Sequence, residues 1–550
     1  MAELDDPRYY LANFHQVLDW LEQRYRDLLT TEELAFLYGF RQVPLPSQAL
    51  LVRMVMRQGE LFRHSRLNYD EIGCTDTAMA PLVQAGWVDD RPRLSVKELF
   101  RQTTLQELRN HLPLANDYPR ASKKDLAEAA IGLIEDQMTL QAWCPGLGDR
   151  VYRLVIMPIC GRFRLMFFGN LHQDWREFVL TELGLYHFEN VPLSEESRAF
   201  NCRRDLDDYL TLHENRKRFE DGEATLAETL AHITPSRPDN AWLEERRSRL
   251  LFELARHCER LEDLDQALTL YRRSHHPETR FRQIRVLERK DLPAQALALA
   301  QDALSAPGGE AEEQMIRRTL PRLHRKLGFP VSPNSRRPAT PRLDFRLPSR
   351  PVPVELLAAE ALETTSGGEV HYVENALITG LFGLLCWDAL FAPLPGAFFH
   401  PFQSAPADLH RTDFVTRRQD LFNAALKTLE DGSYIDQVRR RYEQKWGIQS
   451  LWVNWTRLDR SLLEHALQCI PASHLRLWFQ RLLQDVRGHR SGLPDLVQFW
   501  PVERRYRLIE VKGPGDRLQD NQQRWLHYAM SHDLPVTLCH VSWQQTTTQV

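Results

Sequence analysis

Three ionisable residues near the C-terminal end of this 550-residue chain have the types and the spacing to do chemistry. Asp495 stands in "GLPDL", and Glu510 and Lys512 follow in "YRLIEVKG". The second segment is rich in β-formers and is expected to be a strand. Because side chains alternate along a strand, Glu510 and Lys512 fall on one face with Tyr506 and Leu508. A carboxylate and an ammonium that point the same way could form a catalytic pair, and two solvated charges on a strand are the alternative.

The E-x-K spacing alone decides nothing, because the chain contains it three times. The other two occurrences, Glu288/Lys290 and Glu443/Lys445, lie in helical patterns. Residues two apart on a helix point about 200° away from each other and cannot share a site. We interpret those two pairs as surface charges.

The elements that must position the three residues follow the order β-β-α-β. A strand over 496–500 and a turn over 501–504 make Asp495 the opening residue of the hairpin partner of the Glu510 strand. After "GPGD", Asp520 and Gln523 fit a capping pair for a helix, and "LPVTLCHV" predicts a last strand. The apolar stripe of that helix comprises Trp525, Leu526, Ala529 and Met530.

At this point the chain resembles a known family. Pro494-Asp495, fourteen residues and Glu510-x-Lys512 look like the core of the PD-(D/E)xK nucleases, and "GLPDL…LIEVKGPGDRLQDNQQRWL" resembles the VRR-NUC domain of that superfamily. "HYVENALITGLFGLLCWDALF", "FQSAPADL" and "DFVTRR" extend the resemblance to the Fanconi-associated nucleases, in a shorter bacterial form. The chain departs from the animal members at its N-terminus, where no ubiquitin-binding zinc finger is visible. The resemblance implies a multidomain, mainly α protein with a C-terminal α/β, restriction-endonuclease-like domain.

The same resemblance assigns roles in metal-dependent phosphodiester hydrolysis. Asp495 and Glu510 would ligate Mg²⁺ or Mn²⁺ with the backbone carbonyl of Val511, because hard cations prefer oxygen ligands. Lys512 would orient the attacking water or offset charge on the phosphate. Glu374, in "YVENAL", would be a further metal ligand carried by the helix that opens the domain. An acid placed favourably near a helix N-terminus is the alternative for Glu374.

Two further residues are assigned only because the sequence around them resembles that of the family. Gln522 would contact the active-site water or the scissile phosphate, and a polar residue on an exposed helix face is the alternative. Arg517 is expected to contact a phosphate. Asp388, inside an apolar run, is expected to satisfy a buried hydrogen-bond network instead of binding metal.

The implied activity is that of a 5′-flap endonuclease and 5′-3′ exonuclease acting on branched double-stranded DNA in the repair of interstrand crosslinks. Two alternatives stay open. One is a resolvase of four-way junctions, and the other is a DNA-binding scaffold without catalysis.

The first part of the chain is predicted to bind DNA through two helical modules. Residues 1–94 resemble a winged-helix domain. Residues 95–145 resemble a SAP-type module, in which Thr104/Glu107 and Ser122/Asp125 mark two helix starts. Lys123 and Lys124 at the second start could meet phosphates, although small helical hairpins with a lysine pair are common.

A connector and a helical repeat follow. Within 146–190, "RVYRLVIMPICGRFRLMFFG" predicts a β-hairpin from Arg150 to Gly169, and "DWREFVLTELGLYHFENV" a helix. Within 191–329, "ERLEDLDQALTLY" is echoed by "ERKDLPAQALALA", with Ala267 and Ala296 in equivalent places. This repeat predicts a TPR-like array that could bind protein partners, and a plain helical bundle is the alternative.

The segment 330–353 contains seven prolines and is interpreted as an extended linker, so that 354–550 forms a separate nuclease domain. Ten Lys/Arg residues against one acid, Asp344, lie between Arg317 and Arg350. This stretch could bind nucleic acid or could be a solvated linker.

Composition sets the remaining limits. The net charge of −4 does not itself indicate a nucleic-acid partner. The eight cysteines have no zinc-finger spacing and the N-terminus lacks an apolar signal core, so a reducing, cytoplasmic location is expected, or a nuclear one in a eukaryote. The apolar run from Leu377 is broken by Asp388, Pro393 and Pro395, which favours a buried helix over a membrane span.

Overall fold

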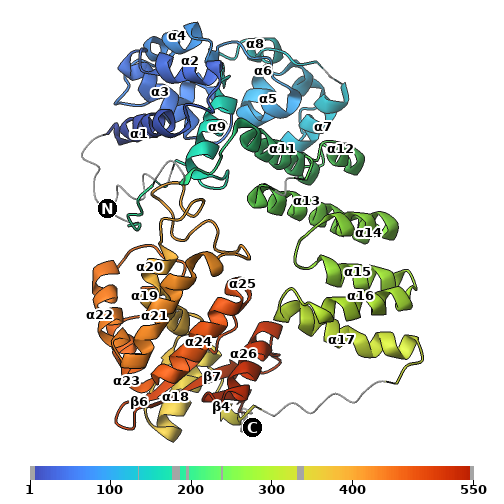
Figure 1. Ribbon diagram of the computed structural model, residues 1–550. Helices are drawn as coiled ribbons and strands as arrows, with labels where there is room; N and C mark the ends of the chain where they lie inside the picture. Colours follow the sequence, from blue (N-terminus) through green and yellow to red (C-terminus); the bar gives the residue numbers. More distant parts are fainter. Residues whose placement is uncertain are drawn as a thin grey trace, which may run out of the picture. The chain divides into compact units, whose positions relative to one another are not determined.

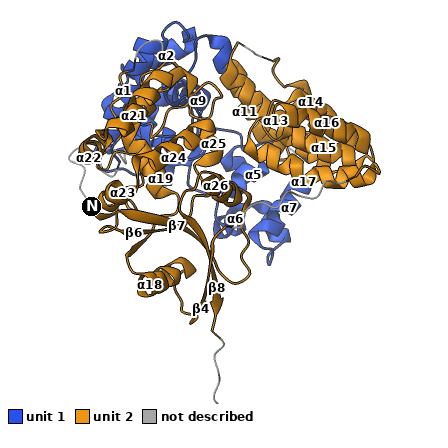
Figure 2. Ribbon diagram, turned by 60° about the horizontal axis from the view of Figure 1, so that its bottom comes forward, with its two compact units in different colours: residues 1–187, 193–206, 399–402 blue, residues 188–192, 207–398, 403–550 orange. Residues whose placement is uncertain are grey.

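The computed structural model describes residues 7–133, 136–175, 177, 186–193, 197–236, 239–330 and 340–544. The chain divides into two compact units (Figures 1 and 2). The N-terminal unit comprises residues 1–187, 193–206 and 399–402, and the C-terminal unit comprises 188–192, 207–398 and 403–550. Each unit is described by itself below.

Helices and one small sheet build the N-terminal unit. Its first part has the bounds α1 Tyr9–Tyr25, α2 Thr31–Phe40, α3 Leu45–Val55, β1 Leu61–Arg63, η1 His64–Arg66, α4 Thr75–Gln84 and β2 Val88–Asp89. Its second part has α5 Val96–Gln102, α6 Leu105–His111, η2 Pro113–Asp117, α7 Lys123–Leu133, α8 Leu140–Trp143, β3 Val151–Leu154 and α9 Met157–Phe168. The strand order is β1-β3-β2, antiparallel throughout.

The predicted hairpin from Arg150 to Gly169 is wrong. Only β3 is a strand, and the chain then enters α9. β3 pairs with β1 and β2 of the preceding domain instead of with its own continuation. The sequence of α9 misleads because this helix buries apolar residues on most of its circumference. It therefore lacks the alternation of apolar and polar residues every three to four positions that marks a half-exposed helix. The helix predicted from Asp174 to Val191 lies mostly outside the described residues.

The predicted helix starts of the SAP-like segment are confirmed. Thr104 and Glu107 form a reciprocal capping box at α6. Ser122 Oγ accepts the N–H of Asp125, and the Asp125 carboxylate accepts the N–H of Ser122. These caps satisfy backbone donors that the short helices cannot satisfy themselves.

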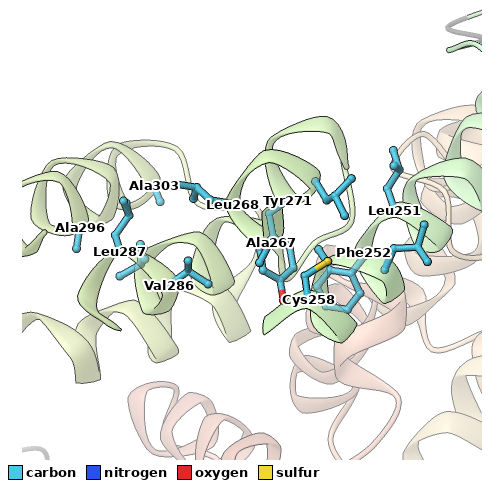
Figure 3. Packing of buried hydrophobic residues seen from close by; sticks show 14 of the residues in the cluster. Leu251, Phe252, Cys258, Ala267, Leu268, Tyr271, Val286, Leu287, Ala296 and Ala303 are labelled. Atoms are coloured by element: carbon cyan, nitrogen blue, oxygen red, sulfur yellow. The ribbon is translucent and has the colours of Figure 1, made fainter. Parts of the chain in front are cut away.

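A stack of antiparallel helices opens the C-terminal unit. After α11 Arg203–Glu220 and α12 Leu226–Ala231 come α13 Ala241–Arg260, α14 Leu264–Arg273, α15 Thr279–Arg289, α16 Pro293–Ser305 and α17 Glu310–Lys326. From α13 to α17 each helix packs on the next. Figure 3 shows the shared core, in which Ala267 and Ala296 are fully buried where neighbouring helices meet. This sequential stacking is what the repeat of about thirty residues predicts.

The nuclease part of the C-terminal unit is a five-stranded mixed sheet with helices on its two faces. Its strands are β4 Arg342–Leu347, β5 Glu369–Tyr372, β6 Leu496–Trp500, β7 Arg505–Lys512 and β8 Val536–Trp543, in the order β4-β8-β7-β6-β5. β7 pairs antiparallel with β6 and parallel with β8. The predicted β-β-α-β order is thus confirmed, with α26 Asp520–Ser531 as its helix.

The two faces of β7 carry different residues, as the strand period predicts. Ile509 and Val511 pack with α18 Val354–Ser366 in an apolar cluster. On the other face, Tyr506 contacts His474 and Trp478 of α24 Ala472–Gln484. The remaining helices are α19 Ala376–Leu385, α20 Trp387–Leu390, η4 Thr416–Arg418, α21 Gln419–Asp431, α22 Tyr434–Lys445, α23 Arg460–Cys469 and α25 Val486–His489.

The interpretation of 330–353 as a linker without regular structure is wrong at β4. This strand pairs in parallel with β8 over Arg342–Leu347, so the sheet begins before residue 354. Leu343, Phe345 and Leu347 pack against the core cluster of the sheet. Prolines 341 and 348 flank the strand without interrupting it.

The basic stretch is largely paired with acids. Arg317, Arg318, Arg322, Lys326, Arg342 and Arg350 form ion pairs with Glu313, Asp520, Glu288, Asp291, Asp344 and Glu360 respectively. Glu288 is buried on α15, so the interpretation of its E-x-K as surface charges is wrong for this residue. Six of the eight basic residues of this stretch that the structure describes are therefore paired with acids of the protein.

The apolar run after Leu377 forms α19 and α20, which are buried helices as predicted. Within the described residues, no helix combines the length and the apolar character that crossing a membrane requires. Asp388 is exposed and forms an ion pair with Arg441 at 2.5 Å. The expectation of a buried network around Asp388 is therefore wrong.

The last helix of the array is tied to the nuclease part. The two terminal guanidinium nitrogens of Arg481 donate to Glu310 of α17 at 2.8 and 2.7 Å. The adjacent His489, at 3.5 Å, and Arg481 lower the pKa of Glu310 to about 2. Arg524 of α26 donates to Gln314 at 2.7 Å.

Replacement of a small residue in the array tests the close helix packing. We expect Ala296→Leu to destabilise the array by about 1–3 kcal/mol, because a buried site without room must shift its neighbours. Ala298→Leu, on the exposed face of the same helix, is the matched control and should change stability by less than about 0.5 kcal/mol. Hydrogen–deuterium exchange of α14–α16 should accelerate only in the first variant, and equal exchange in both would contradict the packing.

Candidate active site

Glu510 and Lys512 lie side by side at the end of β7. Nζ of Lys512 is 2.7 Å from Oε1 of Glu510. The Glu510 side chain is fully buried, and neither of its oxygens has a hydrogen bond of normal geometry. A buried carboxylate oxygen without a hydrogen bond is costly, so a further ligand bound to Oε2 would stabilise Glu510.

Asp495 reaches the same place from the start of β6. Its Oδ2 accepts the backbone N–H of Val511 at 2.9 Å. The hairpin register, which pairs Leu496 with Ile509, sets Asp495 directly beside Glu510. The predicted convergence of Asp495, Glu510 and Lys512 is therefore present in the structure.

Glu374 approaches from the turn between β5 and α19. Its backbone N–H donates to the carbonyl of Asp495 at 2.9 Å, and that carbonyl also accepts the N–H of Val373 at 2.8 Å. Its φ of 44° lies in the left-handed region, which is unfavourable for a residue with a side chain. The expectation that a helix carries Glu374 is wrong, because α19 begins two residues later. The following residue fixes the turn, since Asn375 Oδ1 accepts the N–H of Leu493.

Burial and mutual repulsion disfavour negative charge at this place. Burial, followed by the charge of Asp495, raises the pKa of Glu510 to about 8, against the lowering effect of Lys512. Burial also raises the pKa of Asp495, and the charges of Glu355 and Glu374 add to that effect. Like charges that crowd together in this way mark a place where a cation would be stabilised.

The donor set fits a hard divalent cation. Glu510 offers an unpartnered carboxylate oxygen, Asp495 has a second oxygen besides the one that bonds Val511, and Glu374 is exposed next to them. These are all oxygen ligands, which Mg²⁺ and Mn²⁺ prefer.

Gln522 and Arg517 lie near this site in the chain but are not drawn into it. Gln522 Oε1 accepts the N–H of Gln519 at 2.9 Å, in a capping box at the start of α26. The predicted capping pair Asp520/Gln523 is therefore wrong by one residue. Arg517 is exposed in the loop between β7 and α26. Their roles toward substrate stay predictions.

The two lysines predicted to meet DNA differ in exposure. Nζ of Lys123 donates to the carbonyl of Thr103 at 2.7 Å and so joins two helices of its own module. Lys124 is 85% exposed, 3.8 Å from Glu128. Lys124 is therefore the more exposed of the two, and the contact of both with DNA stays a prediction.

Sequence reasoning missed Glu355 and a polar cavity beside the site. Glu355 lies in the first turn of α18 and acts on Asp495 through its charge. The cavity, of about 590 Å³, is lined by Glu374, Trp452, Arg457 and Arg490 among others. Neither has a local motif. Glu355 directly follows the proline-rich segment in the chain, and only the folded sheet brings it near Asp495.

The family model described as "FAN1, HTH domain" matches residues 8–89, and "VRR-NUC domain" matches 429–543. A Fanconi-associated nuclease 1 homolog of Pseudomonas aeruginosa is 52% identical over 546 residues, covering 98% of this chain and 97% of that protein. The chain belongs to the Fanconi-associated nuclease family.

More distant members and a solved structure agree with this assignment. The homolog of Arabidopsis thaliana is 26% identical over 610 residues and covers 97% of this chain and 67% of that protein. The crystal structure of paFAN1 bound to 5′-flap DNA with a 2-nucleotide flap and a gap is 51% identical, with a TM-score of 0.94 over 99% of this chain and 100% of that chain. The predicted fold class, mainly α with a C-terminal nuclease domain of the VRR-NUC type, is confirmed.

The raised pKa of Glu510 predicts a specific pH dependence of stability without metal. The folded protein keeps a proton on Glu510 up to about pH 8, whereas the unfolded chain loses it near the ordinary value of 4.5. The free energy of unfolding therefore falls as pH rises between these values. Glutamine imitates the protonated carboxyl and does not titrate, so wild type should lose stability relative to Glu510→Gln as pH rises over this range, measured by urea unfolding of chelator-treated protein.

The matched control is Glu503→Gln, at an exposed glutamate of the same hairpin. Its difference from wild type should stay constant with pH. Parallel pH profiles of wild type and Glu510→Gln would contradict the buried state of the carboxyl.

Proposed function

We propose that this member of the family is a divalent-metal-dependent, structure-selective DNA nuclease that acts on 5′ flaps. The observation that carries the proposal is the buried, hydrogen-bond-deficient carboxylate of Glu510 beside Asp495 and Lys512. Such an arrangement is costly for stability and is suited to a cation and an anionic substrate.

Each residue of the site has a distinct part in the proposed hydrolysis. Asp495, Glu510, the carbonyl of Val511 and Glu374 would hold the cation, for which we propose Mg²⁺ or Mn²⁺. When bound, this ion polarises the phosphoryl oxygen and lowers the pKa of water. Lys512 would orient the attacking water or balance charge on the phosphate, since its ammonium is already fixed by Glu510.

Contacts away from the reacting atoms would select the substrate. Arg517, exposed in the loop after β7, would meet a phosphate, and Gln522 would approach with its amide group while its oxygen caps α26. In the N-terminal unit we assign phosphate contact to Lys123 and Lys124, of which Lys123 also donates to the carbonyl of Thr103. The relative of known structure was crystallised with 5′-flap DNA, which supports a branched substrate for this chain as well.

The wider assignment follows the family. We propose 5′-flap incision and 5′-3′ degradation during repair of interstrand crosslinks, in the cytoplasm and nucleoid of a bacterium. The helical array α13–α17 would be available to protein partners, as TPR-like arrays are.

Removal of the ammonium tests the chemistry. We expect Lys512→Ala to slow cleavage of a labelled 5′ flap at least about 100-fold, because charge in the transition state loses its partner. Binding of the flap should stay close to that of wild type. Lys290→Ala, in the helical E-x-K of the array, is the control and should cleave normally. Chelation with EDTA should abolish cleavage by wild type, and activity that survives EDTA would refute the metal mechanism.

Substrate choice separates the nuclease alternatives. The protein should cleave a 5′ flap at least about tenfold faster than a four-way junction of the same sequence, with Mg²⁺ and Mn²⁺ tested side by side. Symmetric cleavage of the four-way junction at the faster rate would favour a resolvase. A salt-sensitive DNA complex without product would favour a scaffold.

A further inference from the structure

A second group of potential metal ligands lies on the far edge of the nuclease sheet. Glu369 and His371 belong to β5, and His465 belongs to α23. One ligand atom from each residue lies within 4.8 Å of the others. Nδ1 of His465 is 3.4 Å and Nε2 of His371 is 4.0 Å from Oε2 of Glu369.

The fold brings these residues together for simple reasons. Glu369 and His371 are two apart on a strand and therefore project to the same face. α23 packs against the neighbouring strand β6 and presents His465 to that face. The ring of Phe499, which pairs with Glu369 in register, lies 6.0 and 6.1 Å from the two imidazoles and forms an apolar floor.

The two imidazole nitrogens have an unexplained environment. Nε2 of His371 and Nδ1 of His465 are buried and have no hydrogen-bond partner. The one nearby carboxylate, Glu369, lies 3.4 and 4.0 Å from these nitrogens without forming a hydrogen bond to either, and the ring centroids are 5.8 Å apart. Buried nitrogens without partners cost free energy that a shared ligand would recover.

We propose that Glu369, His371 and His465 form a second metal site that binds one Zn²⁺ or a similar transition-metal ion. Imidazole with one carboxylate suits zinc, whereas the all-oxygen set of the active site suits Mg²⁺ or Mn²⁺. Zinc bonds of about 2.1 Å bring ligand atoms to roughly 3.4 Å from each other, so the three side chains need only small shifts.

The site would have a structural role. β5 is an edge strand, and Glu374 follows its last residue by two positions. An ion held between β5 and α23 would fix the strand that carries Glu374 to the active site. Zinc binding at these three residues is measured directly and does not depend on the proposed nuclease activity.

Zinc titration of the full-length chain tests the site. Asp495→Asn/Glu510→Gln protein, stripped with chelator, removes the active-site ligands and isolates the second site. Isothermal titration with Zn²⁺ should show one equivalent bound, and zinc should raise the midpoint of thermal unfolding. Adding His371→Ala or His465→Ala should weaken zinc binding at least about tenfold.

Two variants guard against loss of folding and non-specific binding. Glu369→Gln changes an exposed side chain, leaves the fold at little risk, and should also weaken zinc binding. His527→Ala removes an exposed imidazole from α26 and should bind zinc like its parent. X-ray absorption of the zinc-loaded parent should show two histidine ligands. The proposal is overturned if the parent binds no zinc, if the His371 and His465 variants bind it equally well, or if the absorption spectrum shows oxygen ligands alone.

Discussion

The burial of Glu510 beside Asp495 and Lys512 is the constraint on which the nuclease part of the structure depends. Two neighbouring carboxylates repel each other, and burial already disfavours a negative charge on both Glu510 and Asp495. One ammonium, 2.7 Å away, offsets only part of this cost. The surrounding fold must hold these groups together against their mutual repulsion.

The sheet supplies that restraint through its backbone. The antiparallel register of β6 and β7 sets Asp495 beside Glu510, and the N–H of Val511 holds the Asp495 carboxylate in place. The carbonyl of Asp495 in turn accepts two N–H groups from the turn that contains Glu374. Three separate segments are therefore linked through one residue. Apolar packing of Ile509 and Val511 on α18 anchors the opposite face of the strand.

The sequence predicted the parts of this arrangement that local patterns determine. Alternation along 505–512 gave the strand and both of its faces, and the turn residues between 501 and 504 gave the hairpin. The repeat that places Ala267 and Ala296 in equivalent positions predicted the stacked helices, and both alanines are buried in them. In each case, neighbours in the chain are also neighbours in space.

Prediction failed where distant segments decide the outcome. The strand at 151–154 completes a sheet begun some ninety residues earlier, so the local pattern suggested a hairpin that does not exist. β4 was missed because prolines flank it, although the apolar residues Leu343, Phe345 and Leu347 alternate along it as in an edge strand. The turn at Glu374 and the contribution of Glu355 depend on the assembled sheet. The capping residue of α26 was misplaced by one position because Asp520 is a more common N-cap than Gln519.

The position of β4 has a practical consequence for dissecting the protein. A fragment that begins at residue 354 would keep every residue of the catalytic motif yet leave the edge of β8 without its parallel neighbour. Unpaired edges of this kind invite association with other chains. A catalytic fragment must therefore start upstream of Pro341, and it must include α17 if buried Arg481 is to keep its partner Glu310.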